Sequence, residues 1–457
     1  ASRDFMVFNF SRGGFQGGEG VSGGAEWYIE NVIEELDVAR EWWFNKTSKL
    51  LYYKPNSTDF KHSKPPRFGF VATHKKELIR LVGTTEKPIR NVVISGLTLR
   101  DTAYTFMENH GLPSGGDWAL QTQGAITMEN TENITITRNL FTKLDGNAIF
   151  IGGYNRGAMI SRNEFHSIGD SAIAVWGKTS ECLNENCSKR LPEGYMLGPD
   201  GRQGLQPRNT HIMGNLVHEI GIWQKQSSFY FQAVAALTNV KGNVFFNGPR
   251  AAINFNDGFG GGDRITENLI LNTCRESSDH GPWNSWDRVP YITTLRNGTP
   301  SIVPKERSID HNFIIANYHS QEAIDTDDGS AYYSVKNNFF AYGENGLKTD
   351  FGGHDIKFDS NILAYVGNCY QTFSFKGYNS FFTNNTCVFR GSYFGGCNAD
   401  YSLNISNNKV SSKNGDLSVC GMNFSEWQAK GNDRKTTLRR WPTDVQLVQL
   451  SRELLSF

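Results

Sequence analysis

The feature that most constrains the fold of this chain is an asparagine that recurs in short x-Asn-x-apolar motifs. The motif occurs at Asn139, Asn163, Asn215, Asn243, Asn268, Asn312, Asn338, Asn361, Asn385 and Asn408. Successive positions are separated by 24, 52, 28, 25, 44, 26, 23, 24 and 23 residues, so most steps lie near 24. A repeat of this length predicts a solenoid, in which each repeat stacks on its neighbours.

Two steps in this series are longer than the others. The step of 52 from Asn163 to Asn215 fits either two turns of the solenoid or one turn with an insertion. The step of 44 from Asn268 to Asn312 fits one turn with a loop of roughly twenty residues.

The residues between these asparagines favour strands. N-V-V-I-S-G-L-T-L from Asn91 and N-I-T-I-T from Asn133 alternate β-branched and polar residues, and they lack a helical period. We therefore predict an all-β chain, a right-handed parallel β-helix of about 10 to 12 coils, where a coil is one turn of the solenoid. In such a stack each Asn side chain bonds the turn backbone and the Asn of the next coil.

The ends of the chain depart from the repeat. We expect an N-terminal cap region over residues 1–88, the parallel β-helix over 89–423 and a C-terminal helical tail over 424–457 that packs on the solenoid. Residues 26–37 have helical spacing, and Thr443 or Asp444 is placed to cap a short amphipathic helix.

Composition narrows the classes of partner and the compartment. Lys plus Arg and Asp plus Glu both number 46, so no excess charge favours nucleic acid or an anionic membrane. No apolar run approaches the roughly 20 residues of a membrane-spanning helix. Acceptor motifs for N-glycosylation predict a secreted, extracellular glycoprotein. They lie at Asn45, Asn56, Asn133, Asn186, Asn297, Asn384, Asn404 and Asn423.

Seven cysteines support the same compartment. Cys182 and Cys187 lie together in a polar insertion, and Cys274 is the expected unpaired residue. The last coils hold Cys369, Cys387, Cys397 and Cys420. We expect disulfides in both groups, with Cys182, Cys187, Cys387 and Cys397 as the first candidates.

Acidic residues follow several of the motifs at similar offsets. Asp257, Asp279, Asp328 and Asp350 come 14, 11, 16 and 12 residues after the preceding motif asparagine. Stacked coils place such carboxylates about 5 or about 10 Å apart, which brackets the separations that glycosidases use. We expect the substrate to be held by Asp257, His280, Trp283, Trp286, Arg288, Lys348, Asp350 and His354. No cofactor is expected. Calcium bound at the Asp cluster stays an alternative, although D-T-D-D-G-S lacks the ligand spacing of an EF-hand loop.

Four motifs carry a resemblance to a known family. They are N-F-N-D-G-F-G-G-G-D from Asn254, S-S-D-H-G-P-W-N-S-W-D-R from Ser277, D-T-D-D-G-S from Asp325 and L-K-T-D-F-G-G-H-D from Leu347. They resemble secreted right-handed β-helix repeat proteins near the α-L-fucosidases and xylanases of glycoside hydrolase family 141. The resemblance implies catalysis by two Asp residues, Asp287 and Asp328, with Asp279 and Asp327 as close rivals.

Two classes of function follow. The first is a glycoside hydrolase acting on a complex polysaccharide, with a polysaccharide lyase as the second enzymatic possibility, because Lys348 lies among the acids. The other is a structural or matrix glycoprotein derived from such an enzyme. In that case neutral charge and Asn-rich faces would favour self-association.

Overall fold

The computed structural model describes most of the repeat region and both helices of the C-terminal tail. The described residues are 30–56, 58, 69–108, 110–111, 120–178, 204–256, 261–276, 280–286, 291–292, 303–316, 320–327, 330–349, 353–372, 379–395, 397 and 403–456. The chain divides into a small unit, Gly20–Thr73, and a large one comprising Ala1–Glu19 and His74–Phe457.

The described part of the small unit contains one hairpin. Strands β1 (Trp42–Asn45) and β2 (Leu50–Tyr53) pair antiparallel, and the rings of Trp43 and Tyr52 lie 5.4 Å apart. The helix expected over residues 26–37 is reduced in its described part to a 3-10 turn, Ile33–Glu35. None of the residues of this turn is buried, so within the described part burial does not favour a longer helix.

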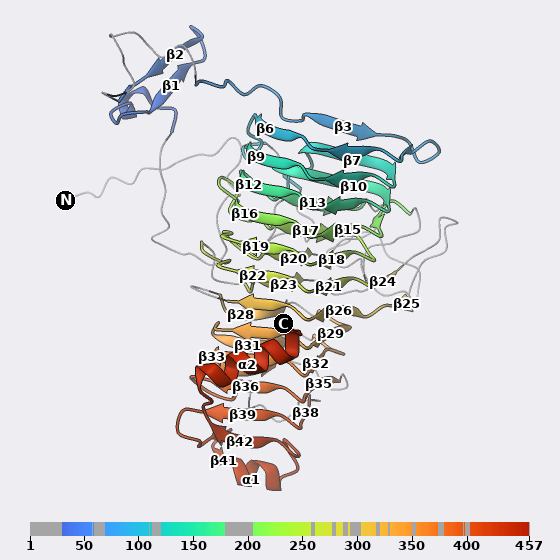
Figure 1. Ribbon diagram of the computed structural model, residues 1–457, viewed down its shortest axis with the longest axis vertical. Helices are drawn as coiled ribbons and strands as arrows, with labels where there is room; N and C mark the ends of the chain where they lie inside the picture. The colour runs from blue at the N-terminus through green and yellow to red at the C-terminus, as the bar shows by residue number, and fades with distance from the viewer. Residues whose placement is uncertain are drawn as a thin grey trace, which may run out of the picture. The chain divides into compact units, whose positions relative to one another are not determined.

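The large unit consists of three parallel sheets whose strands alternate along the chain (Figure 1). The first sheet contains β3 (Ile79–Val82), β4 (Ile89–Arg90), β7 (Gly124–Glu132), β10 (Asn147–Arg156), β13 (Ile173–Trp176), β14 (Pro207–Arg208), β17 (Tyr230–Ala233), β20 (Ile253–Asn256), β23 (Trp283–Trp286), β28 (Glu322–Asp327), β31 (Asn345–Thr349), β34 (Asn368–Thr372) and β37 (Phe394–Gly395). Because β3 pairs with β7, part of the predicted cap region contributes to this sheet.

The other two sheets complete each coil. The second sheet contains β5 (Val93–Ser95), β8 (Thr135–Thr137), β11 (Met159–Ser161), β15 (His211–Met213), β18 (Asn239–Lys241), β21 (Arg264–Thr266), β26 (Arg307–Asp310), β29 (Tyr333–Lys336), β32 (Lys357–Asp359), β35 (Ser380–Thr383) and β38 (Leu403–Ser406). The third contains β6 (Thr98–Thr102), β9 (Leu140–Leu144), β12 (Glu164–Ile168), β16 (Leu216–Ile220), β19 (Val244–Phe246), β22 (Leu269–Leu271), β27 (Phe313–Ile315), β30 (Phe339–Ala341), β33 (Ile362–Val366), β36 (Thr386–Phe389), β39 (Lys409–Ser412) and β42 (Thr437–Arg440).

Two short antiparallel strand pairs and helix α1 of the described large unit also lie outside these sheets. Strands β24 (Tyr291–Ile292) and β25 (Val303–Pro304) pair antiparallel, as do β40 (Ser418–Val419) and β41 (Met422–Asn423). Helix α1 (Phe424–Ala429) follows β41 directly and begins with a capping box at Asn423.

The asparagine ladder is confirmed at all ten positions. Each Asn from Asn139 to Asn385 donates from Nδ2 to Oδ1 of the next, over 2.9 to 3.4 Å. The same Oδ1 also accepts a backbone N–H of the preceding coil. Asn163 bonds Asn215 directly, and Asn268 bonds Asn312, so both long steps are single coils with an insertion.

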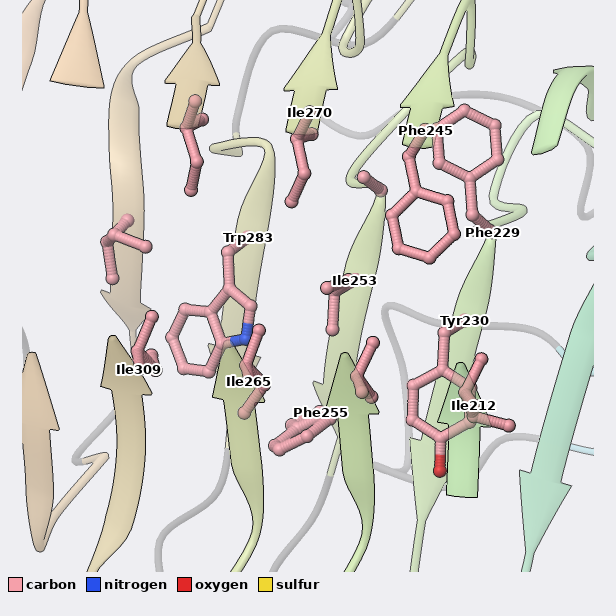
Figure 2. Packing of buried hydrophobic residues seen from close by; sticks show 14 of the residues in the cluster. Ile212, Phe229, Tyr230, Phe245, Ile253, Phe255, Ile265, Ile270, Trp283 and Ile309 are labelled. Atoms are coloured by element: carbon pink, nitrogen blue, oxygen red, sulfur yellow. The ribbon is translucent and has the colours of Figure 1, made fainter. Parts of the chain in front are cut away.

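The interior between the sheets is apolar and continuous. Ile, Val and Phe side chains from all three sheets form one buried cluster that extends from Ile94 to Phe424. In Figure 2, Ile253, Phe255 and Trp283 of the first sheet meet Ile265 and Ile309 of the second. Because side chains alternate across a strand, the residues between these core positions face the outside of the first sheet.

The C-terminal helix is confirmed. Helix α2 (Asp444–Leu455) begins with a capping box in which Thr443 accepts from the backbone N–H of Gln446. Leu447 packs with Phe339, Ile362 and Val388 on the outer face of the third sheet, where the red helix lies in Figure 1. Burial of this apolar stripe attaches the tail to the solenoid.

Candidate functional site

Four neighbouring strands of the first sheet present polar side chains on its outer face. In β20, Asn254 and Asn256 alternate with the core residues Ile253 and Phe255. Pairing of β20 with β23 places Asn254 opposite Asn284, and pairing of β23 with β28 places Asn284 opposite Asp325. A second row, two residues further along the strands, joins Asn256, Trp286 and Asp327 by the same register.

Lys348 of β31 links the two carboxylates of β28. Its Nζ lies 3.1 Å from Oδ1 of Asp325 and 3.6 Å from Oδ1 of Asp327. The exposed fractions of the three side chains are 9% for Lys348, 0% for Asp325 and 21% for Asp327. Asp327 is thus the member of this group that solvent reaches most readily, whereas Asp325 is inaccessible to solvent.

Asp325 is held in an environment that favours its neutral form. Burial raises the pKa of this carboxyl well above its usual value, and the nearby Lys348 charge counteracts that effect only in part. Glu322 and Asp327 add repulsion, which raises the pKa further. Asn284 donates from Nδ2 to Oδ2 of Asp325 over 3.1 Å, so the carboxyl is fixed from two sides.

His280 lies at the edge of the same group. Arg250 donates to its Nε2, and Nδ1 lies 3.4 Å from Nδ2 of Asn284. Burial, followed by the positive charges of Arg250 and Lys348, lowers the pKa of His280 well below its usual value, so the ring is neutral at physiological pH. His280 thus lies between the Arg250 guanidinium and Asn284 of the outer face.

The outer face also carries amides whose hydrogen-bonding capacity is unused. Both side-chain polar atoms of Asn254 and Asn256, and Oδ1 of Asn284, are buried and have no partner among the described residues. Buried amides without a partner are costly, by roughly 1–3 kcal/mol each. Their clustering in two rows beside Asp325 and Asp327 is typical of a site that holds ordered water or the hydroxyls of a ligand.

The structure brings three of the residues expected from the sequence into this group, namely Asp327, Lys348 and His280. The expectation that Trp283 holds the substrate is wrong. Its ring does not stack on a sugar, because it is fully buried in the core against Phe255 and Tyr333. In β23 the Trp283 side chain points into the core, and the motif W-N-S-W alone does not show which of its residues point inward.

The remaining expected residues are Trp286, His354 and six that lie outside the described part of the chain. The backbone of Trp286 pairs with Asp327, as stated above. His354 is found after β31, where its Nδ1 lies 2.7 Å from Asp355 and its ring contacts Tyr332 edge-on. Outside the described residues are Asp257, Asp279, Asp287, Arg288, Asp328 and Asp350.

The reasoning from sequence missed Asp325, Asn254, Asn256, Asn284 and Arg250 as parts of the group. A signal was present in N-F-N, W-N-S-W and D-T-D, which carry polar or aromatic residues at alternating positions of three successive strands. Alternation of this kind indicates that i and i+2 share the outer face.

The cysteines and acceptor asparagines are placed as follows. Cys369 is bonded to Cys387 and Cys397 to Cys420, which confirms disulfides in the last coils, while Cys274 is a free, buried thiol. Burial raises the pKa of Cys274 to about 12, so it is not a reactive thiol. Cys182 and Cys187 lie outside the described residues.

Among the acceptors, four are exposed, and they are Asn133, Asn384, Asn404 and Asn423. Asn45 and Asn56 are partly exposed, whereas Asn186 and Asn297 lie outside the described residues. Within the described part of the chain, no group of three or more His, Cys, Asp or Glu side chains is arranged to hold a metal. Nor does any helix in that part have the length and apolar character needed to cross a membrane.

Comparison with known proteins agrees with this architecture. A family model described as a right handed beta helix region matches residues 92–275. The fold is a right-handed parallel β-helix. No curated protein matches the chain.

A solved structure described as "Glycoside hydrolase" is similar at a TM-score of 0.49 and 15% identity, over 73% of this chain and 57% of that one. The chain therefore spans somewhat more than half the length of that protein. A similarity this distant says nothing about the reaction of the present chain.

Proposed function

We propose that this protein is an extracellular glycoside hydrolase that cleaves a complex polysaccharide on the outer face of the first sheet. The observation that carries the proposal is the group formed by Asp325, Asp327 and Lys348 beside Asn254 and Asn256, whose buried amides have no partner among the described residues. Glycoside cleavage uses two carboxyl groups that flank the scissile bond, and it is helped by polar groups that bind the sugar hydroxyls; Asp327 and the neighbouring amides would supply one carboxyl group and the hydroxyl contacts.

In this proposal Asp327 is the carboxylate that meets the substrate, since it is the most exposed of the three. Asp325 is a positioning residue, because it is fully buried and acts through its contacts with Lys348 and Asn284. The Lys348 ammonium then lies between the two carboxyl groups and fixes the geometry of Asp327. The second catalytic carboxylate is proposed to be one of Asp279, Asp287 and Asp328.

Secretion is part of the same proposal. Two disulfides staple the last coils, and four acceptor asparagines are exposed on the surface. Disulfides persist in oxidising compartments, and N-linked glycans are added to surface residues of secreted chains. Both features suit a protein that meets polysaccharides outside the cell, and mass spectrometry of the secreted protein would detect glycans at Asn133, Asn384, Asn404 or Asn423.

The test of the reaction is a panel of fucosylated glycans, xylans and uronate polymers incubated with the wild type and with Asp327→Asn. New reducing ends that depend on Asp327 are expected. Asp416→Asn is the matched control, because Asp416 is exposed and lies after the last strand of the second sheet. Ultraviolet absorbance of unsaturated uronates would instead indicate a lyase, with Lys348 as the candidate base.

The alternative is a structural glycoprotein that self-associates. Its support is the outer face of the third sheet, where Leu216 is 37% exposed and Val244 and Leu269 are partly exposed. A folded wild-type protein that acts on no glycan in the panel, and that sediments as a concentration-dependent oligomer, would favour this role over the enzyme.

A further inference from the structure

A row of charged residues crosses the first sheet at its end remote from Asp327. Pairing of β4, β7, β10 and β14 places Arg90, Glu132, Arg156 and Arg208 side by side on successive strands. The residues that precede Glu132 and Arg156, Thr131 and Asn155, are buried and bonded to each other. By alternation, the charged row belongs to the outer face of the sheet.

The one acid of the row is already engaged by other residues. Oε2 of Glu132 accepts from Nε of Arg90 over 2.6 Å, and Oε1 accepts from the Tyr154 hydroxyl over 2.6 Å. Arg156 stacks on the Tyr154 ring with 4.2 Å from Cζ to the centroid. It also donates to the carbonyl oxygens of Gln206 and Gly204. The row thus has three positive charges against one negative charge.

Arg208 is the exceptional member of the row. Only 3% of its surface is exposed, and Nε and Nη2 are buried without any acceptor in the described part of the chain. Burial, followed by repulsion from Arg156, lowers the pKa of this guanidinium to about 10. A buried charge that finds no acceptor among the described residues is costly, because it gives up hydration without a compensating ion pair there.

We propose that Arg208, supported by the charge of Arg156, binds a single oxyanion group, a carboxylate or a sulfate, of a ligand on this face. The planar guanidinium presents adjacent N–H groups that match two oxygens of such an anion, and Nε with Nη2 forms one of these forks. An anion there would supply the acceptors that the described part of the chain does not. The proposal stands independently of glycoside hydrolysis, because it rests on no residue of the group around Asp327.

The position of Arg208 also indicates how long a ligand must be to contact both Arg208 and Asp327. Strand β14 pairs with β10 and lies in the same coil as β13. The first-sheet strands of the next four coils are β17, β20, β23 and β28. Arg208 therefore lies four coils from Asp327, which corresponds to about 19 Å along the stack. An acidic oligosaccharide of several residues would be long enough to reach both places.

The experiment compares the wild type with Arg208→Met by calorimetric titration and by thermal unfolding. The probes are inorganic sulfate, a uronate disaccharide, a sulfated disaccharide and a neutral disaccharide. The wild type is expected to bind at least one anionic probe and to unfold at a higher temperature in its presence, whereas Arg208→Met should bind that probe at least tenfold more weakly. Arg439→Met is the control, because Arg439 is an exposed arginine of β42 at the other end of the stack.

Stability without a probe provides a second readout. If Arg208 has no partner in the chain, Arg208→Met should unfold at the same or a higher temperature than the wild type. Arg208→Lys keeps the charge but not the fork, and it should bind the probe with intermediate affinity. Response to inorganic sulfate would indicate a site for the free anion, and response only to one disaccharide would identify the uronate or the sulfate ester as the source.

Three results would overturn the proposal. They are the absence of any response of the wild type to the anionic probes, an equal response of wild type and Arg208→Met, and a loss of folding in Arg208→Met without anion. The first two would show that no anion depends on Arg208. The third would show that the guanidinium stabilises the chain by itself.

Discussion

Replacement of Asn268 by Ala is a direct test of the asparagine ladder. The Asn268 Nδ2 group donates to the Val240 carbonyl and to Oδ1 of Asn312, both over 2.9 Å. Its Oδ1 accepts from the backbone N–H and from Nδ2 of Asn243, both over 3.0 Å. The alanine variant would remove all four hydrogen bonds. The backbone N–H of Asn243 and the carbonyl of Val240 would lose these partners, whereas Asn243 Nδ2 would still donate to Ile212 and Asn312 Oδ1 would still accept from the backbone N–H of residue 268.

The magnitude follows from the cost of such groups. An unsatisfied buried donor or acceptor costs roughly 1–3 kcal/mol, and partial relaxation or an entering water recovers part of it. For the two backbone groups we therefore expect Asn268→Ala to lower the free energy of unfolding by about 2–6 kcal/mol. Asn414→Ala is the matched control, because Asn414 is exposed beyond the last ladder position, and its change should be within about 0.5 kcal/mol.

Urea unfolding of the three proteins, followed by circular dichroism and by tryptophan fluorescence, measures the difference. Hydrogen exchange at the amide of Asn243 would locate it, since this N–H loses its acceptor in the variant. A loss of stability below about 1 kcal/mol with unchanged exchange at Asn243 would refute the reasoning, because the ladder would then be a by-product of the turns.

Two further predictions concern the buried carboxyl of Asp170 and the attachment of the C-terminal helix. Burial raises the pKa of Asp170 to about 7 from a usual 3.8, so the native state binds the additional proton and stability should fall as pH rises from about 4 through 7. Asp170→Asn should match the wild type near pH 4 and be more stable at pH 8, by up to about 4 kcal/mol; thermal unfolding at both pH values tests this, and equal stability at pH 8 would contradict it. Leu447→Ala should release α2 from the third sheet, at a cost of about 2–4 kcal/mol, seen as faster proteolysis of the tail with little change in unfolding of the coils; unchanged cleavage of the tail would contradict this assignment.

The fold was predictable because the same physical demand recurs in every coil. A tight turn between the second and third sheets needs a side chain that both donates and accepts, and the residue before it adopts a positive φ, as at Arg138 and Arg162. Asparagine satisfies the first demand at each coil. The 52-residue step stayed ambiguous, because an insertion within one coil and a second coil have similar lengths.

The site was harder to predict because its register depends on loops of variable length. Offsets from the ladder asparagine indicate the side of the coil, but not whether a given residue alternates inward or outward. Trp283 and Asn284 are neighbours in sequence, yet one is in the core and the other contacts Asp325. Lys348 and Asp325 lie 23 residues apart and meet only through the pairing of β28 with β31.

The measurement that tests the central claim most directly is the rate of glycan cleavage by wild type, Asp327→Asn and Asp416→Asn on one susceptible polysaccharide. The account predicts that Asp327→Asn is correctly folded and lowers the rate by about 10²–10⁴-fold, while Asp416→Asn retains the wild-type rate. Full activity of Asp327→Asn, with reducing ends released as by the wild type, would contradict the assignment of the active site to the outer face of the first sheet.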